Sequence, residues 1–174
     1  LEERVLATIY RFRMVTPGGA VLVAVSGGVD SMTLLRVLRR LPLNLRLAVF
    51  HLNHGLRPES EEEARMVSEI CEGWSLPCQV RKIDGERLRR ASSLEAVARD
   101  ERYRLLAEVA QEIGVDRIAL GHHADDQVET MVMRFLSGAG PQGMAGIPPV
   151  RGRYIRPLFE VSREEILDYA EKAG

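Results

Sequence analysis

The stretch AVLVAVSGGVDSMTLLRVLRR, residues 20–40, decides the fold of this chain. Its first six residues form a continuous apolar, largely β-branched run, which is typical of a strand buried on both faces. The chain then passes through Gly27 and Gly28 into a segment with apolar residues at helical spacing. Arginines stand in the last turn of that segment, where positive charge favours a helix C-terminus. The stretch therefore predicts a buried strand, a tight glycine turn and a helix.

The remaining sequence alternates between strand and helix patterns. We expect further strands at 45–52, 78–83 and 116–122, helices at 1–14, 57–74, 93–114, 124–138 and 162–174, and a short extended piece at 154–159. Ser93 and Ser162 are suited to N-caps, and Gly114 to a C-cap. This order predicts an α/β fold with a doubly wound, Rossmann-like parallel sheet and helices on both faces. The 174 residues fit a single domain.

Composition narrows the class of protein. The chain is 45% hydrophobic and 28% charged, as expected for a folded globular protein, and its net charge of −1 gives no overall basic field. Cys71 and Cys78 are too few for a disulfide framework, and their spacing matches no zinc pattern. No signal peptide is evident, and no apolar run approaches the ~18 residues of a membrane helix. We therefore expect a cytoplasmic protein without a membrane partner.

Three polar clusters follow predicted strands. SGGVDS follows the first strand, HLNHGLR lies at the end of the second, and GHHADD follows the fourth. The carboxyl ends of parallel strands share one edge of the sheet, where ligands of such folds bind. We therefore expect these clusters to form one site.

The SGGVDS loop, residues 26–31, has the features of an anion cradle. Glycine lets the backbone approach a ligand without a Cβ, and the N-terminus of a helix offers unpaired N–H groups to phosphate. No lysine follows the glycines, so the loop is not a Walker motif, and the G-x-G-x-x-G fingerprint of dinucleotide binding is absent too. A tight turn without a ligand is the structural alternative. The predicted nucleotide-binding residues of this loop are Ser26, Gly27, Gly28, Val29, Asp30 and Ser31.

The loop resembles the S-G-G-x-D-S signature of the N-type ATP pyrophosphatases, the PP-loop superfamily. In that superfamily the loop holds the β- and γ-phosphates as a leaving pyrophosphate, and AMP is transferred to a substrate oxygen. The resemblance implies ATP as a bound nucleotide. It also accounts for the missing lysine, because the bond that breaks lies between the α- and β-phosphates.

Other segments are similar to the tRNA(Ile)-lysidine synthetase family. They are FHLNHGLRPES at 50–60, ARDERYRLL at 98–106, GHHADDQVET at 121–130 and GAGPQGMAGIPPVRGRYIRPL at 138–158. The similarity runs from about residue 19 to residue 170. Related tRNA 2-thiolation enzymes share the histidine–aspartate segment, but those of the thiocytidine type add cysteine pairs for an iron–sulfur cluster. This chain has no such pairs.

Three carboxylates, Asp125, Asp126 and Glu129, stand in the first turns of the helix expected at 124–138. Acids in a first turn often only complement the helix dipole. Alternatively they bind Mg²⁺ or a cationic nucleophile, since Mg²⁺ with ATP takes one or two carboxylates plus phosphate oxygens. We expect Asp30 and Asp126 as metal ligands and Asp30, Asp126 and Glu129 as catalytic residues.

The four histidines all lie in the second and third clusters. Their spacing fits no standard zinc pattern, so zinc is the less favoured alternative. We expect His54 to bind the nucleotide and His122 to act on a phosphate or on the carbonyl oxygen under attack. One histidine of the 122–123 pair is a candidate for packing alone.

Arginines supply further candidates. Arg99 and Arg102 stand at helical spacing, and either form a solvated charged surface or, as the resemblance implies, face the α-phosphate or the tRNA. We expect both to be catalytic and Arg57 to bind the nucleotide.

The resemblance implies adenylation of C2 of the wobble cytidine in a tRNA(Ile) with a CAU anticodon, followed by attack of free L-lysine. The implied partners are thus this tRNA and lysine, and a homodimer is left open. We expect the chain to be an N-terminal catalytic domain, with tRNA-binding domains beyond Gly174, because an entire tRNA needs a larger positive surface. A tRNA thiolase and a nucleotide sensor without chemistry are the rival functions.

Overall fold

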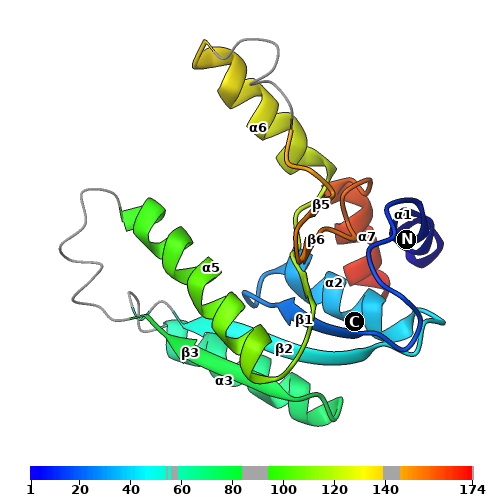
Figure 1. The fold of residues 1–174 in the computed structure, drawn as a ribbon, viewed down its shortest axis with the longest axis vertical. Helices are drawn as coiled ribbons and strands as arrows, with labels where there is room; N and C mark the ends of the chain where they lie inside the picture. Colours follow the sequence, from blue (N-terminus) through cyan, green and yellow to red (C-terminus); the bar gives the residue numbers. More distant parts are fainter. Residues whose placement is uncertain (54, 56–58, 84–93, 139–145, 174) are drawn as a thin grey trace.

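A computed structural model describes residues 1–53, 55, 59–83, 94–138 and 146–173. Six strands form one sheet in the order β3-β2-β1-β4-β6-β5 (Figure 1). The strands are β1 (Ala20–Ala24), β2 (Arg46–Asn53), β3 (Cys78–Lys82), β4 (Arg117–Ala119), β5 (Val150–Arg151) and β6 (Tyr154–Ile155). All neighbours pair in parallel except β5 and β6. The expected doubly wound parallel sheet is confirmed, with an antiparallel strand added at one edge.

The sheet is buried on both faces, as the apolar run of β1 predicts. Val21 and Val23 pack into one core cluster, together with residues of α1 (Glu2–Arg11), α2 (Val29–Arg40), α3 (Glu59–Gly73) and α7 (Arg163–Ala173). Leu22 faces the opposite side and packs into a second cluster with α5 (Leu94–Glu112). Successive side chains of a strand point to opposite faces, so alternate residues of β1 serve the two clusters.

Two of the expected helix caps are confirmed. Ser162 and Glu165 form a reciprocal cap at the start of α7, where Ser162 N–H donates to the Glu165 carboxylate at 2.9 Å and Glu165 N–H donates to Ser162 Oγ at 3.3 Å. Gly114 ends α5 with a φ of +67°, a left-handed conformation that favours glycine. Ser93 lies outside the described residues.

The β5–β6 hairpin departs from the sequence prediction. The extended piece at 154–159 contains β6, but β5 was not expected, because two residues next to Pro148 and Pro149 are too short to show strand alternation. The chain reverses direction between them at Gly152, whose φ is +59°. The fourth strand is also shorter than predicted, with only three residues in β4.

Helix α6 (Ala124–Leu136) projects away from the body of the molecule (Figure 1). None of its residues is buried. Its outer half carries exposed apolar side chains, among them Phe135 and Leu136, which are 67% and 74% exposed. Among the helices described, none is long and apolar enough to span a membrane.

Candidate active site

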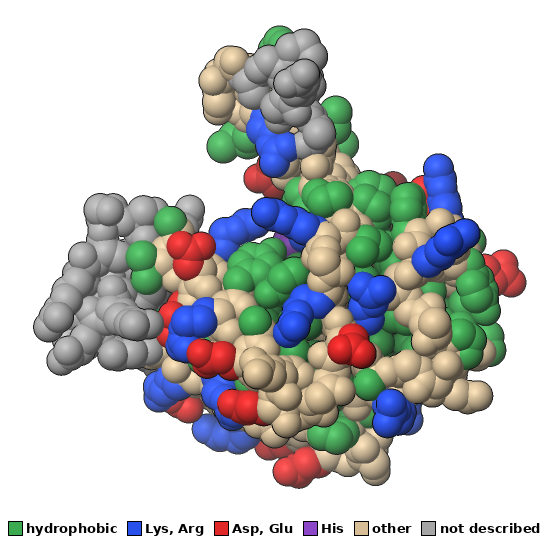
Figure 2. Space-filling model, viewed as in Figure 1, with side chains coloured by type: hydrophobic (Ala, Val, Ile, Leu, Met, Phe, Trp, Pro, Cys, Tyr) green, Lys and Arg blue, Asp and Glu red, His purple; other side chains and the backbone are tan. Residues whose placement is uncertain are grey.

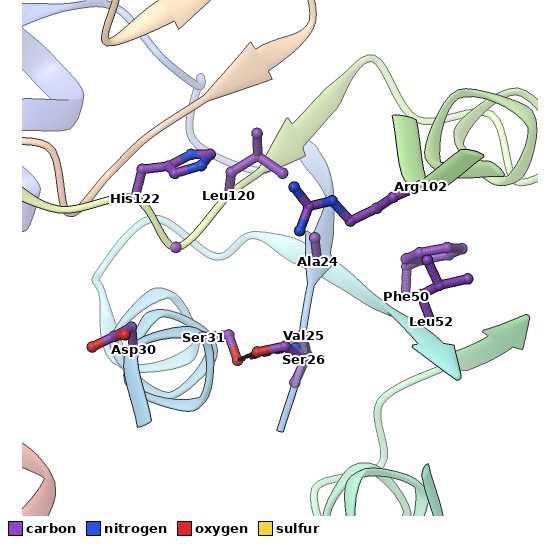
Figure 3. Close-up of a pocket in the computed structure, with 11 residues that line it drawn as sticks. Ala24, Val25, Ser26, Asp30, Ser31, Phe50, Leu52, Arg102, Leu120 and His122 are labelled. Carbon is purple, nitrogen blue, oxygen red and sulfur yellow. Dashed lines mark hydrogen bonds between the residues drawn. The ribbon is translucent and has the colours of Figure 1, made fainter. Parts of the chain in front are cut away.

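A pocket of about 190 Å³ lies where the strand order reverses, between the carboxyl ends of β1 and β4 (Figure 3). Ligands of doubly wound sheets bind at such a switch point. Ser26, Asp30 and Ser31 line one side of the pocket, while Gly121 and His122 line another. The first and third polar clusters therefore meet, as the sequence predicts.

Hydrogen bonds among its own residues fold the SGGVDS loop. Ser31 Oγ donates to Gly28 O at 3.0 Å and accepts from Ser26 N–H at 3.1 Å. Ser26 Oγ in turn accepts from Gly28 N–H at 3.3 Å. Gly28 is the N-cap residue of α2, and no side chain caps that end of the helix. The first turn of α2 thus begins with backbone N–H groups that can donate hydrogen bonds to a phosphate.

Two glycines are required by the geometry. Gly27 has a φ of +90°, which L side chains rarely adopt. A Cβ on Gly121 would lie 3.3 Å from Ser31 Cα and 3.4 Å from Ser31 N, a tight contact with backbone. The loop after β4 therefore packs directly against the first turn of α2, and this contact holds the two sides of the pocket together.

Two buried polar atoms beside the pocket lack a hydrogen-bond partner within the described structure. They are Asp30 Oδ1 and Arg102 Nε. Buried polar groups are normally hydrogen-bonded, and an unpartnered one costs about 1–3 kcal/mol. Arg102 reaches from α5 toward the end of β1 (Figure 3). A carboxylate and a guanidinium that each keep one unbonded polar atom at the same pocket fit a ligand that carries both cations and anions.

His123 lies beneath the loop and is 4% exposed. Its Nε2 is 3.8 Å from Asp30 Oδ2 and 3.7 Å from Asp126 Oδ2, so one imidazole lies between these two carboxylates. Asp126 also accepts from His123 N–H at 2.8 Å, which caps the start of α6. Asp125 instead accepts from Arg163 N–H at 2.8 Å, so its carboxylate caps α7. For Asp125 this favours the helix-dipole interpretation.

His122 is held as a neutral imidazole with a defined tautomer. Burial lowers the pKa of His122 to about 4, and the positive charges of Arg156, Arg102 and Arg99 add to this effect against the opposing Asp126. Arg156 Nε donates to His122 Nδ1 at 3.3 Å. Because Nδ1 accepts, the ring proton resides on Nε2. His122 therefore offers a neutral N–H donor at the pocket.

The comparison that decides the family is a match to a PP-loop domain over residues 2–174. The chain belongs to the PP-loop family. It is similar to tRNA(Ile)-lysidine synthases from Thermotoga sp. (strain RQ2), with 42% identity over 92% of this chain, and from Symbiobacterium thermophilum, with 45% identity over 100%. The chain spans about 40% of the length of these curated relatives.

Two solved structures share the fold of this PP-loop chain. The U34-tRNA thiolase NcsA from Methanococcus maripaludis has a TM-score of 0.80 at 20% identity, covering 99% of this chain and 61% of that one. The NH3-dependent NAD synthetase from Campylobacter jejuni has a TM-score of 0.63 at 16% identity, covering 99% and 71%. At these identities the likeness concerns the fold alone.

The remaining predicted site residues do not all lie at the pocket. Arg102 lines the pocket, whereas Arg99, one turn earlier on α5, is exposed and lines a neighbouring cleft. Glu129 is exposed on α6, and Val29 lines a separate hollow beside α7. His54 and Arg57 lie outside the described residues.

Three residues received no individual role in the sequence analysis. Gly121 is required by the contact with Ser31, and Arg156 by its bond to His122. His51 is 1% exposed, and its Nδ1–H donates to Val25 O at 2.9 Å, which fixes the end of β1. A signal existed for Arg156, because a charged residue between Ile155 and Leu158 in an apolar run is unusual. Its partners become visible only in three dimensions.

Zinc receives no support within the described ranges, where no group of three or more histidine, cysteine or acidic residues is arranged to hold a metal ion. The thiols are equally remote from the chemistry. Burial raises the pKa of Cys71 to about 12 and also raises that of Cys78. Cys78 is the first residue of the edge strand β3, whereas the pocket lies at the carboxyl ends of the central strands.

Proposed function

We propose that this chain is the ATP-using part of a tRNA(Ile)-lysidine synthase. The observation that carries the proposal is the pocket itself, which is lined by residues of the SGGVDS loop, by Asp30 with its Oδ1 unbonded and by Arg102 with its Nε unbonded. The curated relatives supply the substrate class. The proposed substrates are ATP, the wobble cytidine of a tRNA(Ile) with a CAU anticodon, and L-lysine.

Two sides of the pocket carry groups suited to binding a nucleotide. The loop and the first turn of α2 offer N–H groups to the β- and γ-phosphates. Ala24, the last residue of β1, and Phe50, within β2, provide an apolar wall suited to adenine. Arg102, with its Nε unpartnered, is placed to bind an α-phosphate oxygen.

The reaction proceeds in two displacements. The C2 carbonyl oxygen of the cytidine attacks the α-phosphorus, and the α–β phosphoanhydride bond breaks to release pyrophosphate. The ε-amine of lysine then attacks C2, the C2–O bond breaks, AMP leaves, and the amine loses a proton. Asp126 or Glu129 is the proposed acceptor of that proton. His122, neutral with its proton on Nε2, donates a hydrogen bond to the phosphate oxygen on which negative charge develops.

Asp30 and Asp126 would hold Mg²⁺. Both carboxylates lie within 3.8 Å of one nitrogen of His123, and Asp30 Oδ1 has no partner among the described residues. Two carboxylates suit Mg²⁺, which completes its shell with water and phosphate oxygens. When bound, the ion neutralises charge on the phosphates.

Two rival functions are weaker on these observations. A thiolase relay would need a reactive thiol at the pocket, but Cys71 and Cys78 are distant from it and their thiols are protonated at neutral pH. A nucleotide sensor would have no use for a neutral histidine donor held by Arg156. A cytoplasmic location, a homodimer and further tRNA-binding domains stay predictions.

The direct test combines the chain with Mg²⁺, ATP, lysine and a tRNA(Ile) transcript carrying CAU. Mass spectrometry of the nucleotides and of the digested RNA should find AMP and a cytidine that has gained lysine. Without lysine, the modified nucleoside should be absent. ADP together with unmodified RNA would contradict the proposal. AMP formation at the same rate with and without the RNA would favour a different acceptor of the adenylyl group.

A further inference from the structure

A second, larger cleft of about 700 Å³ lies beside the pocket and is lined by residues of α5, of the β5–β6 hairpin and of the last turn of α6. Five arginines line it: Arg99, Arg134, Arg151, Arg153 and Arg156. Asp100 is its one acidic lining residue. Figure 2 shows Lys and Arg side chains around a hollow on this face of the molecule. A chain with a net charge of −1 therefore concentrates positive charge at one place.

Among the described residues, two arginines of this cleft lack the carboxylate partner that several other surface arginines have. Elsewhere Arg4, Arg11 and Arg104 form ion pairs with glutamates. In the part of the chain that the structure describes, Arg151 and Arg153 have no carboxylate partner, and both are exposed. Unpaired guanidinium groups gathered in a concave surface attract a polyanion, and their planar forks suit phosphate.

Aromatic rings stand among these charges. Arg99 and Arg102 lie over the Tyr103 ring at 5.6 Å and 5.7 Å, and the Tyr103 and Tyr154 rings meet edge to face at 5.0 Å. Both tyrosines are half-buried and line the cleft. Unstacked bases bind to aromatic faces and to guanidinium planes, whereas the bases along a duplex are stacked on one another and present no free faces. The mixture favours a single-stranded nucleic acid.

The cleft continues into the active-site pocket. Arg156 lines the cleft, His122 lines the pocket, and a hydrogen bond of 3.3 Å joins the two side chains. On α5, Arg99 faces the cleft and Arg102, one turn further on, faces the pocket. A strand held by the cleft would thus place one nucleotide at the pocket and its neighbours on the arginines.

We propose that this arginine cleft binds the single-stranded loop of an RNA substrate, with backbone phosphates on Arg151 and Arg153 and a base on Tyr103. The inference rests on the proposed function for the identity of the RNA, an anticodon loop. An acidic protein segment would satisfy the arginines but would leave the tyrosine faces and the continuity with the pocket unexplained.

Charge reversal on the hairpin tests the cleft. The double variant Arg151→Glu/Arg153→Glu is compared with Arg39→Glu/Arg46→Glu, an equal charge change at exposed residues. Arg39 lies in the last turn of α2 and Arg46 at the start of β2, and neither residue lines the cleft. The probe is a fluorescent 17-nucleotide CAU stem-loop, roughly the size of an anticodon arm, and anisotropy at several salt concentrations gives its Kd. Thermal unfolding by circular dichroism confirms that both variants fold.

The cleft variant should weaken stem-loop binding by at least ~10-fold at low salt and reduce the salt slope by ~1–2. The control should change Kd by less than ~2-fold beyond the general effect of net charge. Equal weakening in both variants, or no binding by the wild-type chain at low salt, would overturn the proposal. A blunt-ended RNA duplex of two strands, which has no loop, should bind more weakly, and equal binding would contradict the single-strand assignment.

Failure of this inference is distinguishable from failure of the proposed function. If the wild-type chain forms lysidine while the cleft variant binds the stem-loop normally, the function stands and the cleft assignment is wrong. If the cleft variant loses binding but the wild-type chain never forms AMP, the cleft binds RNA and the reaction is wrong.

Discussion

Helices α2 and α6 occupy equivalent positions and differ in how they are held. Each follows a central strand of the sheet, β1 or β4, and each points its N-terminus at the pocket. α2 buries six residues, including Leu34 and Leu38, whereas α6 buries none. The proposed phosphate-binding loop and Asp30 therefore belong to a well-packed helix, whereas Asp126 and Glu129 belong to a projecting helix with no buried residue.

This difference suggests that the two helices serve the site in different ways. Groups that hold a nucleotide in one geometry gain from a support that does not move, because misplacement by about 1 Å costs rate. Local stability varies across a fold, and segments with few buried contacts open at the lowest cost. We expect the base of α6, with Asp126 and Glu129, to be the side of the site that adapts to its substrates.

Truncating one apolar side chain on each helix gives the largest expected contrast. Leu34→Ala removes a fully buried side chain and should lower the free energy of unfolding by about 2–5 kcal/mol. Leu136→Ala, at a residue 74% exposed, should change it by no more than about 0.5 kcal/mol. Urea unfolding followed by circular dichroism measures both. A large loss in Leu136→Ala would mean that α6 has a packing partner.

The acidic residues of the two helices provide the next contrast. Asp30→Asn, in the first turn of α2, should reduce AMP formation by about 100-fold, or roughly 2.7 kcal/mol, because it removes the charge proposed to bind Mg²⁺. Asp125→Asn, in the first turn of α6, should lower the rate by less than about 3-fold, because its carboxylate caps α7 and Asn still accepts that hydrogen bond. Initial rates of AMP release at saturating Mg²⁺ distinguish them, and equal effects would refute the assignment.

The loop that leads into α6 can be tested by pH. The pKa of His122 is lowered in the folded state to about 4. The unfolded chain therefore takes up the proton first, so the stabilisation is complete above about pH 6.5 and is lost as pH falls toward 4. Relative to His122→Gln, the wild type should lose about 2 kcal/mol of unfolding free energy between pH 7.5 and pH 5. Parallel pH profiles for the two proteins would show that His122 is solvated.

Two glycines with positive φ give the smallest contrast. Gly27 precedes α2 with a φ of +90°, and Gly138 follows α6 with a φ of +74°. An alanine strains both, by about 1 kcal/mol. Gly27→Ala should lower global stability by that amount, whereas the end of α6 absorbs the strain in Gly138→Ala by fraying, with a smaller change in melting temperature. Equal shifts would indicate that the end of α6 is as well held as the start of α2.

The sequence predicted the parts of the site that local chemistry determines. The SGGVDS loop follows from an apolar strand and a glycine turn, and its place at the switch point follows from the order of the elements. The distinction between Arg99 and Arg102 did not follow, because both are arginines one turn apart on the same helix and only the packing of α5 turns one toward the pocket. The role of Arg156 could not be predicted for a similar reason. Its hydrogen-bond partners, His122 and Pro148, lie in other segments of the chain and approach it only in the folded structure.

The edge strand β5 has a consequence for how the molecules behave together. A sheet ends in unpaired backbone N–H and C=O groups, which invite a strand from another molecule. At this edge the strand comprises only Val150 and Arg151, follows two prolines that have no N–H to donate, and carries an exposed positive charge. Short, charged, proline-flanked edges discourage intermolecular β-pairing, so this side of the sheet is protected against aggregation.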